Sequence, residues 1–212
     1  MGRRFLITGT DIGVGKTTVG CALGFAMRAR GIRVGVMKPV ETGCAEVEGK
    51  LEPADARALA LAASSPAPLE LICPYRYRSR DLLPAPDLGE IARCFHKIAA
   101  DSDAMLVESA GGITTPITLD SDFADLAAQL GLEVIVVVGN RLGCVSATTL
   151  TLAQCATRGL SVAGYILCDC EPVASSATDD TEAALMRLGV APYLGRMRHR
   201  EPLAKAIVEQ LL

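Results

Sequence analysis

The sequence predicts an α/β fold: a doubly wound, mainly parallel sheet with helices on both faces. Short apolar runs alternate with helical segments along the chain of 212 residues. Runs such as Val134–Val138 are apolar throughout, which is typical of strands covered on both faces. Strands that alternate with helices usually pair in parallel, because each helix forms the crossover to the next strand. We expect a single domain over residues 1–212.

The apolar runs and the helical spacing place the elements in order. Strands are expected at Arg4–Thr8, Val34–Met37, Ala104–Val107, Val134–Val138, Val162–Leu167 and Tyr193–Leu194. Helices are expected over Thr17–Arg30, Ala54–Ala63, Leu88–Ala100, Phe123–Leu130, Gly143–Arg158, Asp180–Leu188 and Leu203–Leu212. Glycine stands where several helices should end, at Gly31, Gly131, Gly159 and Gly189. Gly43–Pro53 and Ser64–Pro86 are rich in proline, serine and charge, and we expect them to be mobile loops.

The composition argues against several classes of partner. The net charge is −3 and the isoelectric point is near 5.5, whereas a protein that holds a nucleic-acid backbone is more often basic. No apolar stretch reaches eighteen residues, so we expect no membrane span. The eight cysteines form no Cys-x-x-Cys pair, and the first residues lack the apolar core of a signal peptide. We therefore expect reduced thiols and a cytoplasmic protein.

Residues 9–17, Gly-Thr-Asp-Ile-Gly-Val-Gly-Lys-Thr, join the first strand to the first helix. Glycines at such a turn let backbone N–H groups face a phosphate, and the helix start adds partial positive charge. Lys16 can reach the β- and γ-phosphates, and Thr17 can place its hydroxyl on Mg²⁺. A glycine-rich turn that binds nothing is the alternative, but Gly15-Lys16-Thr17 lies where strand gives way to helix. The spacing makes this a variant P-loop, because Thr10 holds the place of the usual first glycine.

Ligand-binding loops of such sheets leave the carboxyl ends of the strands, and charged residues stand there. Lys38 ends the second strand, where it is either a surface lysine or a cation over a phosphoryl group or a carboxylated substrate. Glu108 ends the next strand, where it is either an acid in a glycine turn or a second Mg²⁺ ligand. Asp55, near a helix start, is most simply a first-turn residue favoured by the helix dipole.

Two further strand ends are less specific. Gly143 begins a helix whose free N–H groups could hold a carboxylate or a phosphate, although an ordinary connection is equally compatible with the sequence. The strand that ends at Leu167 leads into Cys168 and Asp169, which by topology can approach a nucleotide base.

Together these motifs resemble those of the dethiobiotin synthetase family, in the same order and over nearly the whole chain. The resemblance is carried by Thr8–Thr17, Lys38-Pro39-Val40 with Thr42-Gly43, Glu108 with Ala110-Gly111-Gly112, Phe123-Ala124-Asp125, and Leu142-Gly143-Cys144. It implies an enzyme of biotin biosynthesis that depends on ATP and Mg²⁺. An amine of 7,8-diaminopelargonic acid takes up CO₂, ATP phosphorylates the carbamate, and the second amine closes the ureido ring with release of phosphate.

The resemblance also implies roles for residues of this chain. The catalytic residues would be Lys16, Lys38 and Thr10. The nucleotide would be bound by Asp11, Ile12, Gly13, Val14, Gly15, Lys16, Thr17, Thr18, Glu108, Gly111, Cys168 and Asp169. Mg²⁺ would be held by Thr17, Asp55 and Glu108. The substrate would be held by Lys38 and Thr42 and, at its distal carboxylate, by Gly143, Cys144 and Val145 of the other subunit of a homodimer.

The chain departs from the family pattern at two positions. Ser109 replaces a glycine, so its hydroxyl extends or crowds the loop beside the phosphates. Cys168 stands where many relatives carry an asparagine that reads the adenine edge, and a thiol cannot supply an amide's donor and acceptor. We therefore expect the nucleotide base to be read loosely, so that other nucleoside triphosphates are accepted.

Two other functions fit the sequence less well. The amidotransferases of cobyrinic-acid synthesis usually carry a glutaminase domain, for which no length remains. Dimeric ATPase switches of the chromosome-partition or septum-site type typically carry a second lysine early in the P-loop, where this chain has Thr10-Asp11.

Overall fold

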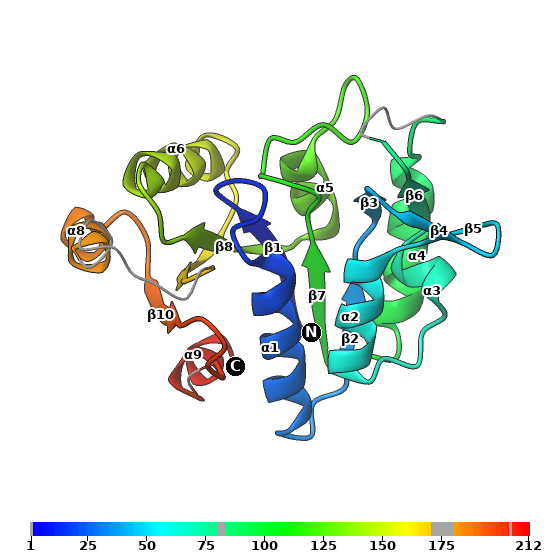
Figure 1. Cartoon of the computed structure of the whole chain (residues 1–212), viewed down its shortest axis with the longest axis horizontal. Coiled ribbons are helices and arrows are strands. Elements are labelled where there is room, and N and C mark those ends of the chain that lie inside the picture. Colours follow the sequence, from blue (N-terminus) through cyan, green and yellow to red (C-terminus); the bar gives the residue numbers. More distant parts are fainter. Residues whose placement is uncertain (1, 80–83, 171–179, 204) are drawn as a thin grey trace.

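Six parallel strands form the central sheet, in the order β10-β9-β8-β1-β7-β2 (Figure 1). The computed structural model describes residues 2–79, 84–170, 180–203 and 205–212. The strands of this sheet are β1 (Arg3–Gly9), β2 (Val34–Met37), β7 (Ala104–Glu108), β8 (Glu133–Gly139), β9 (Val162–Cys168) and β10 (Tyr193–Met197). Because β1 lies between β7 and β8, the loop after β1 leaves the sheet where the strand order reverses, the usual ligand position in such folds.

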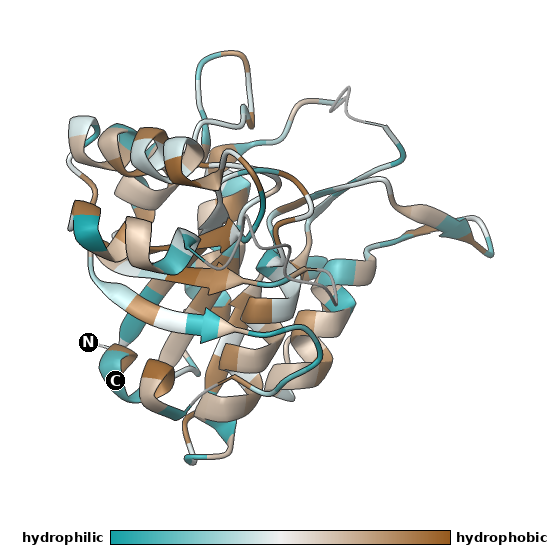
Figure 2. Cartoon of the chain, turned by 60° about the vertical axis from the view of Figure 1, so that its left-hand side comes forward, coloured by the Kyte–Doolittle hydropathy of each residue, from teal (hydrophilic) through white to brown (hydrophobic). Residues whose placement is uncertain are grey.

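Helices cover both faces of the sheet (Figures 1 and 2). They are α1 (Lys16–Arg28), α2 (Ala54–Ala63), α3 (Leu69–Ile72), α4 (Leu88–Ala99), α5 (Phe123–Leu130), α6 (Cys144–Thr157), α8 (Thr181–Leu188) and α9 (Lys205–Leu211). α1 packs against α2 and α9, and α4 packs against α3 and β2. None of the helices in the described residues combines the length and the apolar character that a membrane crossing requires.

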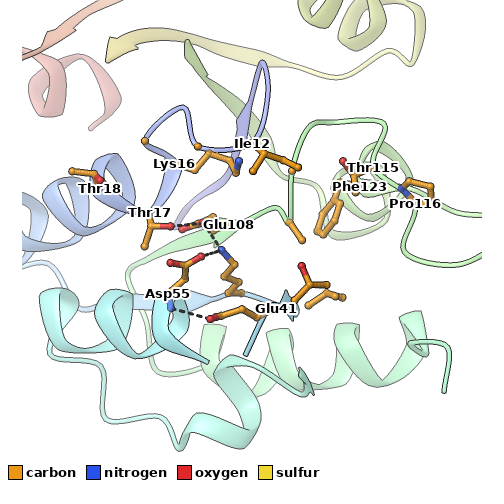
Figure 3. A pocket seen from close by; sticks show the side chains of 18 of the residues that line it. Ile12, Lys16, Thr17, Thr18, Glu41, Asp55, Glu108, Thr115, Pro116 and Phe123 are labelled. Carbon is orange, nitrogen blue, oxygen red and sulfur yellow. Dashed lines mark hydrogen bonds and ion pairs between the residues drawn. The ribbon is translucent and has the colours of Figure 1, made fainter. Parts of the chain in front are cut away.

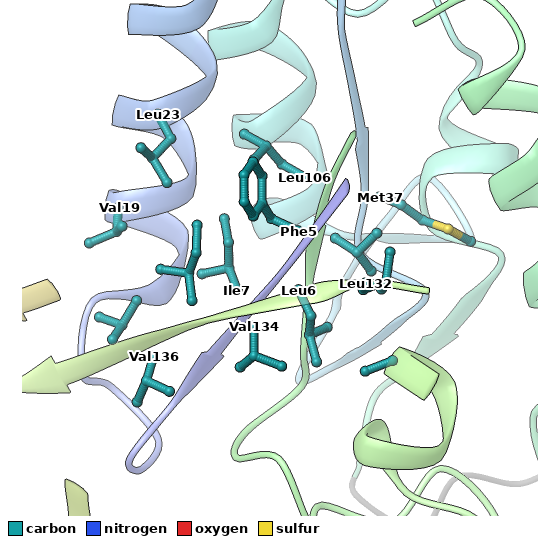
Figure 4. Close-up of a cluster of buried hydrophobic side chains, with 14 of the residues drawn as sticks. Phe5, Leu6, Ile7, Val19, Leu23, Met37, Leu106, Leu132, Val134 and Val136 are labelled. Carbon is teal, nitrogen blue, oxygen red and sulfur yellow. The ribbon is translucent and has the colours of Figure 1, made fainter. Parts of the chain in front are cut away.

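The core lies where α1 covers the middle of the sheet (Figure 4). Phe5, Leu6 and Ile7 of β1 are fully buried, as the continuous apolar run predicts. Val19 and Leu23 repeat at helical spacing on the buried side of α1. Burial of such side chains stabilises a fold by roughly 1.5–3 kcal/mol each. This packing fixes the start of α1 over the carboxyl end of β1.

The predicted fold class is confirmed, and every predicted strand and helix is present. Val34–Met37, Ala54–Ala63 and Phe123–Leu130 have the predicted bounds, while most other ends differ by one or two residues. β10 is longer than predicted, since it continues to Met197.

Five short elements were not predicted. One follows shortly after Lys38, and the other four lie in the two stretches that were expected to be mobile loops. They are β3 (Val40–Thr42), β4 (Ala45–Val47), β5 (Lys50–Glu52), α3 and β6 (Tyr75–Tyr77). β3 pairs with β6 in parallel, and β4 pairs with β5 as a hairpin that projects from the body of the molecule (Figure 2). The hairpin turn is Glu48-Gly49, and both residues have positive φ, as tight hairpin turns require. The residues 80–83 of the second stretch lie outside the described residues.

Candidate functional site

A cavity of about 890 Å³ opens at the carboxyl ends of β1, β7 and β2. Figure 3 shows the side chains that line it, which come from the P-loop, β3, α2, the β7 end and the start of α5. The predicted residues that line it are Ile12, Gly13, Gly15, Lys16, Thr17, Thr18, Lys38, Thr42, Asp55, Glu108 and Gly111. The structure therefore brings most of the predicted phosphate-side residues together. Arg78, Thr115 and Phe123 also line the cavity, and no sequence pattern had pointed to them as ligands.

The P-loop has the geometry of a phosphate cradle. Gly13 and Gly15 adopt left-handed backbone conformations, with φ of 72° and 93°. Gly15 precedes α1 and no side chain caps the helix, so the first N–H groups of α1 remain available to an anion. Val14 packs beneath the loop, where a Cβ on Gly9 would lie 2.6 Å from its Cγ2. The loop is thus held by apolar packing on the Val14 side, next to the uncapped start of α1.

Lys16 curls over this loop. Its Nζ donates to the Asp11 carbonyl at 3.1 Å, and the residue is only 8 % exposed. Burial lowers the pKa of Lys16, and Glu108 opposes that shift by its negative charge. An anion at the loop would restore the interactions that the buried ammonium lacks.

A buried charge cluster lies beside the loop, formed by Lys38, Asp55, Glu108 and Thr17 (Figure 3). Lys38 Nζ lies 2.6 Å from Glu108 Oε1 and pairs also with the Asp55 carboxylate. The Thr17 hydroxyl donates to the same Glu108 oxygen at 2.8 Å. Lys38 and Asp55 are 17 positions apart in the sequence, and Thr17 and Glu108 are 91 positions apart, so it is the fold that brings these residues together. The surface-lysine alternative for Lys38 is wrong, because the residue is 4 % exposed.

The cluster shifts the pKa values of its members. Burial raises the pKa of Glu108, against the opposing effect of the Lys38 ammonium. For Lys38, burial alone would lower the pKa, but Glu108 and Asp55 together raise it above its ordinary value. Lys38 therefore stays charged and pairs with both carboxylates.

The donor set of this cluster fits Mg²⁺. Glu108 Oε2 is buried and has no hydrogen-bond partner in the described part of the chain, which leaves one oxygen for a cation. The hydroxyl of Thr17 and the carboxylates of Glu108 and Asp55 are hard oxygen donors of the kind that Mg²⁺ prefers. Within the described ranges, no three or more His, Cys, Asp and Glu side chains are grouped to hold a metal ion by themselves. Mg²⁺ commonly completes its coordination with phosphate oxygens and water, so a site of this kind needs a nucleotide.

Glu41 is a polar residue of this site that the sequence did not reveal. Its side chain is buried and crosses from β3 to the start of α2, where it accepts the backbone N–H groups of Asp55 at 3.0 Å and Ala56 at 2.9 Å. Burial raises the pKa of Glu41, while these two N–H groups lower it. The one signal in the sequence was Pro53 before α2. A proline side chain cannot accept the hydrogen bonds that a helix start offers, so the acceptor has to come from another part of the chain.

Ser109, the residue that replaces the family's glycine, is fully buried behind the phosphate side. Its Oγ lies 2.8 Å from the Gly111 carbonyl and 3.1 Å from Thr8 Oγ1. The hydroxyl thus ties the loop after β7 to β1. Gly111, with φ of 93°, makes the turn that this contact encloses.

The other strand ends present a different arrangement. Cys168 is buried against the P-loop, so that a Cβ on Gly15 would lie 2.5 Å from its Sγ. A hydrogen bond with Cys170 and burial both raise the pKa of the Cys168 thiol. Asp169 accepts a hydrogen bond from the Asn140 amide at 2.7 Å and is bound by two nitrogens of Arg196. Cys168 and Asp169 are thus each bound to other side chains of this region, and neither lines the cavity.

Four predicted residues outside the cavity lining lie in the P-loop and at the start of α6. Gly143 precedes α6 in a left-handed conformation, with φ of 84° and no side-chain cap, and Cys144 and Val145 form the first turn. Asp11 pairs with Arg141 across the P-loop, and its carboxylate also accepts the Ile12 N–H at 2.7 Å.

Thr10 also lies outside the cavity lining and is bound through its backbone, since its N–H donates to the Val137 carbonyl at 3.0 Å. One chain alone therefore does not bring Thr10, Asp11 or the start of α6 into the cavity.

Comparisons with known proteins agree with this geometry. A family model described as AAA domain matches residues 3–206. An ATP-dependent dethiobiotin synthetase from Anaeromyxobacter dehalogenans (strain 2CP-C) is 41 % identical over 211 residues, which cover 95 % of this chain and 88 % of the relative. The enzyme of the same name from Anaeromyxobacter sp. (strain Fw109-5) is 39 % identical over 96 % of this chain and 89 % of its own.

Solved structures are similar in fold. The septum site-determining protein MinD of Pyrococcus horikoshii OT3, complexed with Mg-ADP, has a TM-score of 0.63 and 20 % identity over 99 % of this chain and 86 % of its own. A ParA family ATPase of Chlorobium tepidum TLS has a TM-score of 0.60 and 15 % identity over 100 % of this chain and 89 % of its own. At such identities the likeness shows the P-loop NTPase fold and nothing about the reaction.

Proposed function

Because the chain belongs to the dethiobiotin synthetase family, we propose that it is an ATP-dependent ligase that forms dethiobiotin from 7,8-diaminopelargonic acid and CO₂. The observation that carries this proposal is a pair of buried lysines, Lys16 and Lys38, that line one cavity beside the P-loop. Two cations at one cavity suit a reaction in which a carbamate and a γ-phosphate, both anions, must approach each other.

The proposed reaction has three steps. An amine of the substrate attacks CO₂ and loses a proton, which gives a carbamate. A carbamate oxygen then attacks the γ-phosphorus of ATP, and ADP leaves. The second amine attacks the carbonyl carbon of this mixed anhydride and loses a proton, the C–O bond to phosphate breaks, and phosphate leaves as the ureido ring closes.

Lys16 and Lys38 stabilise the negative charge that gathers as carbamate and phosphoryl group meet. This is electrostatic catalysis by charges held in place before the reaction, and no covalent intermediate with the protein is needed. Thr42 lines the same cavity and holds the substrate end near Lys38. The buried position of both lysines limits their hydration, so their interaction with an anion is stronger than it would be in water.

Thr17, Asp55 and Glu108 are the residues that would hold Mg²⁺. The ion supplies charge neutralisation at the nucleotide phosphates. The support for this assignment is the unpartnered Glu108 Oε2 beside the Thr17 hydroxyl.

We propose further that the enzyme acts as a homodimer with composite sites. The start of α6 lies outside the cavity of its own chain, and large apolar side chains stand exposed at Leu142 (82 %) before it and Leu150 (69 %) on it. We propose that the partner chain covers these two side chains. The N–H groups at Gly143–Val145 would then hold the distal carboxylate of a substrate bound in the other chain's cavity.

The test is phosphate release from ATP with and without 7,8-diaminopelargonic acid and bicarbonate, with dethiobiotin identified by mass spectrometry. We expect release to require both and to match the product one to one. Release that proceeds at the same rate without the diamine would instead indicate an ATPase switch of the chromosome-partition or septum-site type.

A further inference from the structure

We propose that Glu41 is a positioning residue that sets the affinity of this site for Mg²⁺, by holding the first turn of α2 and with it Asp55. The idea rests on the proposed function only for the assignment of Asp55 to the metal. Its observations are the two hydrogen bonds from the start of α2 to the buried Glu41 carboxylate.

The start of α2 needs an acceptor that its own sequence does not supply. The first N–H groups of any helix lack partners within the helix. The N-cap of α2 is Pro53, and no side-chain cap bond forms there. Glu41 provides both acceptors from a strand 14 positions earlier in the chain, with one carboxylate oxygen for each N–H. Its negative charge also suits the positive end of the helix dipole.

The same contact decides where the Asp55 carboxylate lies. The Asp55 backbone is bound by Glu41, and its side chain pairs with Lys38, so the residue is held at both ends (Figure 3). Asp55 is the most exposed of the charged residues in the cluster, with 44 % of its side chain accessible, whereas Lys38 and Glu108 are fixed by burial. Without Glu41 the first turn of α2 would be free to fray, and the Asp55 carboxylate would lose its fixed position.

Glu41 also connects two parts of the cavity. It lies in β3, between Val40 and Thr42, and β3 begins two residues after Lys38. Within the described residues, the strand that pairs with β3 is β6. The Glu41 contact therefore joins the loop that carries Lys38 and Thr42 to the helix that carries Asp55. A residue behind a metal ligand typically changes metal affinity by about 10- to 100-fold when it is removed.

The experiment uses the full chain with ADP and MgCl₂ as the probes. Calorimetry gives the affinity for ADP without metal. The increase in ADP affinity as MgCl₂ is added gives the apparent dissociation constant for Mg²⁺. For Glu41→Ala we expect the apparent Mg²⁺ dissociation constant to rise about 10- to 100-fold, while metal-free ADP affinity stays within about threefold. Glu41→Gln should lie between, since its amide oxygen can still accept one of the two N–H groups.

Glu52→Gln is the matched control. Glu52 also contacts α2, through an exposed ion pair with Arg57, and lies outside the cavity lining. Its substitution should leave the Mg²⁺ dependence unchanged. Hydrogen exchange at the Asp55 and Ala56 amides should speed up in Glu41→Ala and not in Glu52→Gln, because only Glu41 protects those two groups.

Unchanged Mg²⁺ dependence in folded Glu41→Ala would overturn the proposal. So would an equal loss of ADP affinity with and without the metal, since that result indicates a merely structural role. If Glu41→Ala does not fold, Glu41→Gln decides by the same criteria. The measurement is of binding, so it remains informative even if no dethiobiotin is formed.

Discussion

The two halves of the sheet's carboxyl edge are built differently. The phosphate half, at the ends of β1, β7 and β2, buries Lys16, Lys38 and Glu108 at one cavity. In the other half, at the ends of β8, β9 and β10, Asp169 is bound by Asn140 and Arg196 and does not line this cavity. Within the described residues, the phosphate half keeps an unpartnered Glu108 oxygen and a helix start without a side-chain cap for a ligand. The phosphate half is therefore open to a ligand, whereas the polar side chains of the other half are bonded to one another.

The largest effect is expected in the phosphate half. Lys16→Ala should lower turnover by about 10³-fold or more, because the lost group carries a full charge and the loss of one preorganised donor already costs roughly 2.7–4 kcal/mol in a transition state. The measurement is steady-state kcat with saturating ATP and diamine. Lys50→Ala, on the exposed β4–β5 hairpin, is the control for a lost positive charge. Near-normal ring closure in folded Lys16→Ala would remove the basis of the P-loop assignment.

Lys38 should matter for turnover more than for nucleotide binding. Lys38→Gln should reduce kcat about 10²-fold while ADP still binds, because the amide can hydrogen-bond Glu108 but cannot neutralise a phosphoryl group. Lys38→Ala should in addition destabilise the fold, by about 3–5 kcal/mol if Glu108 is left charged and unpaired. Thermal melts and calorimetry separate the two effects. Lost ADP affinity with normal saturated turnover would contradict the role assigned to Lys38.

Mixing two inactive variants tests whether the phosphate half of one chain works together with the start of α6 of the other chain. Lys16→Ala disables the cavity, and Val145→Asp places a negative charge where the partner's substrate carboxylate is proposed to bind. An acid in the first turn of α6 suits the helix dipole, so the fold should persist. When equal amounts of the two variants exchange subunits at random, about half of the dimers are mixed. Each mixed dimer has one intact site of two, so about a quarter of wild-type activity should return.

Val145→Asn is the neutral control and should remain active. Sedimentation velocity shows whether dimers form. Mixed dimers that regain no activity, or a fully active monomer, would mean that each chain completes its own site.

The smallest effect is expected at the base. GTP or CTP should support ring closure within about tenfold of ATP in kcat/KM, a difference of about 1.4 kcal/mol, because Cys168 offers no amide to the base edge. Cys168→Asn should shift the preference toward ATP, and Cys168→Ala, which removes the thiol without adding an amide, should not. A thousandfold preference for ATP in the wild type would place base recognition elsewhere in the molecule.

The phosphate half was predictable because its signals are local. A strand, a glycine turn and a helix start lie within residues 5–17, and Lys38 and Glu108 each end an apolar run. The packing of Cys168 against Gly15 joins residues from two distant loops, so no local pattern reveals it.

The short elements around the cavity were missed for a related reason. β3 and β6 have three residues each and exist only because they pair with one another across 35 positions of sequence. Segments of that length have no periodicity of their own to detect. Glu41 escaped notice because the helix start that it caps lies 14 residues away, whereas a sequence search for caps looks at adjacent positions.

The central place of β1 has a consequence for the order in which the chain can fold. β1 is synthesised before the other strands of this sheet, yet its two neighbours are the strands at Ala104–Glu108 and Glu133–Gly139. Arg3 pairs with Ala104, and Gly9 pairs with Val137. The phosphate loop cannot be supported from both sides until the chain has been synthesised through β8. Such distant pairings are slow to form, so a nascent chain stalled before β8 should not retain nucleotide.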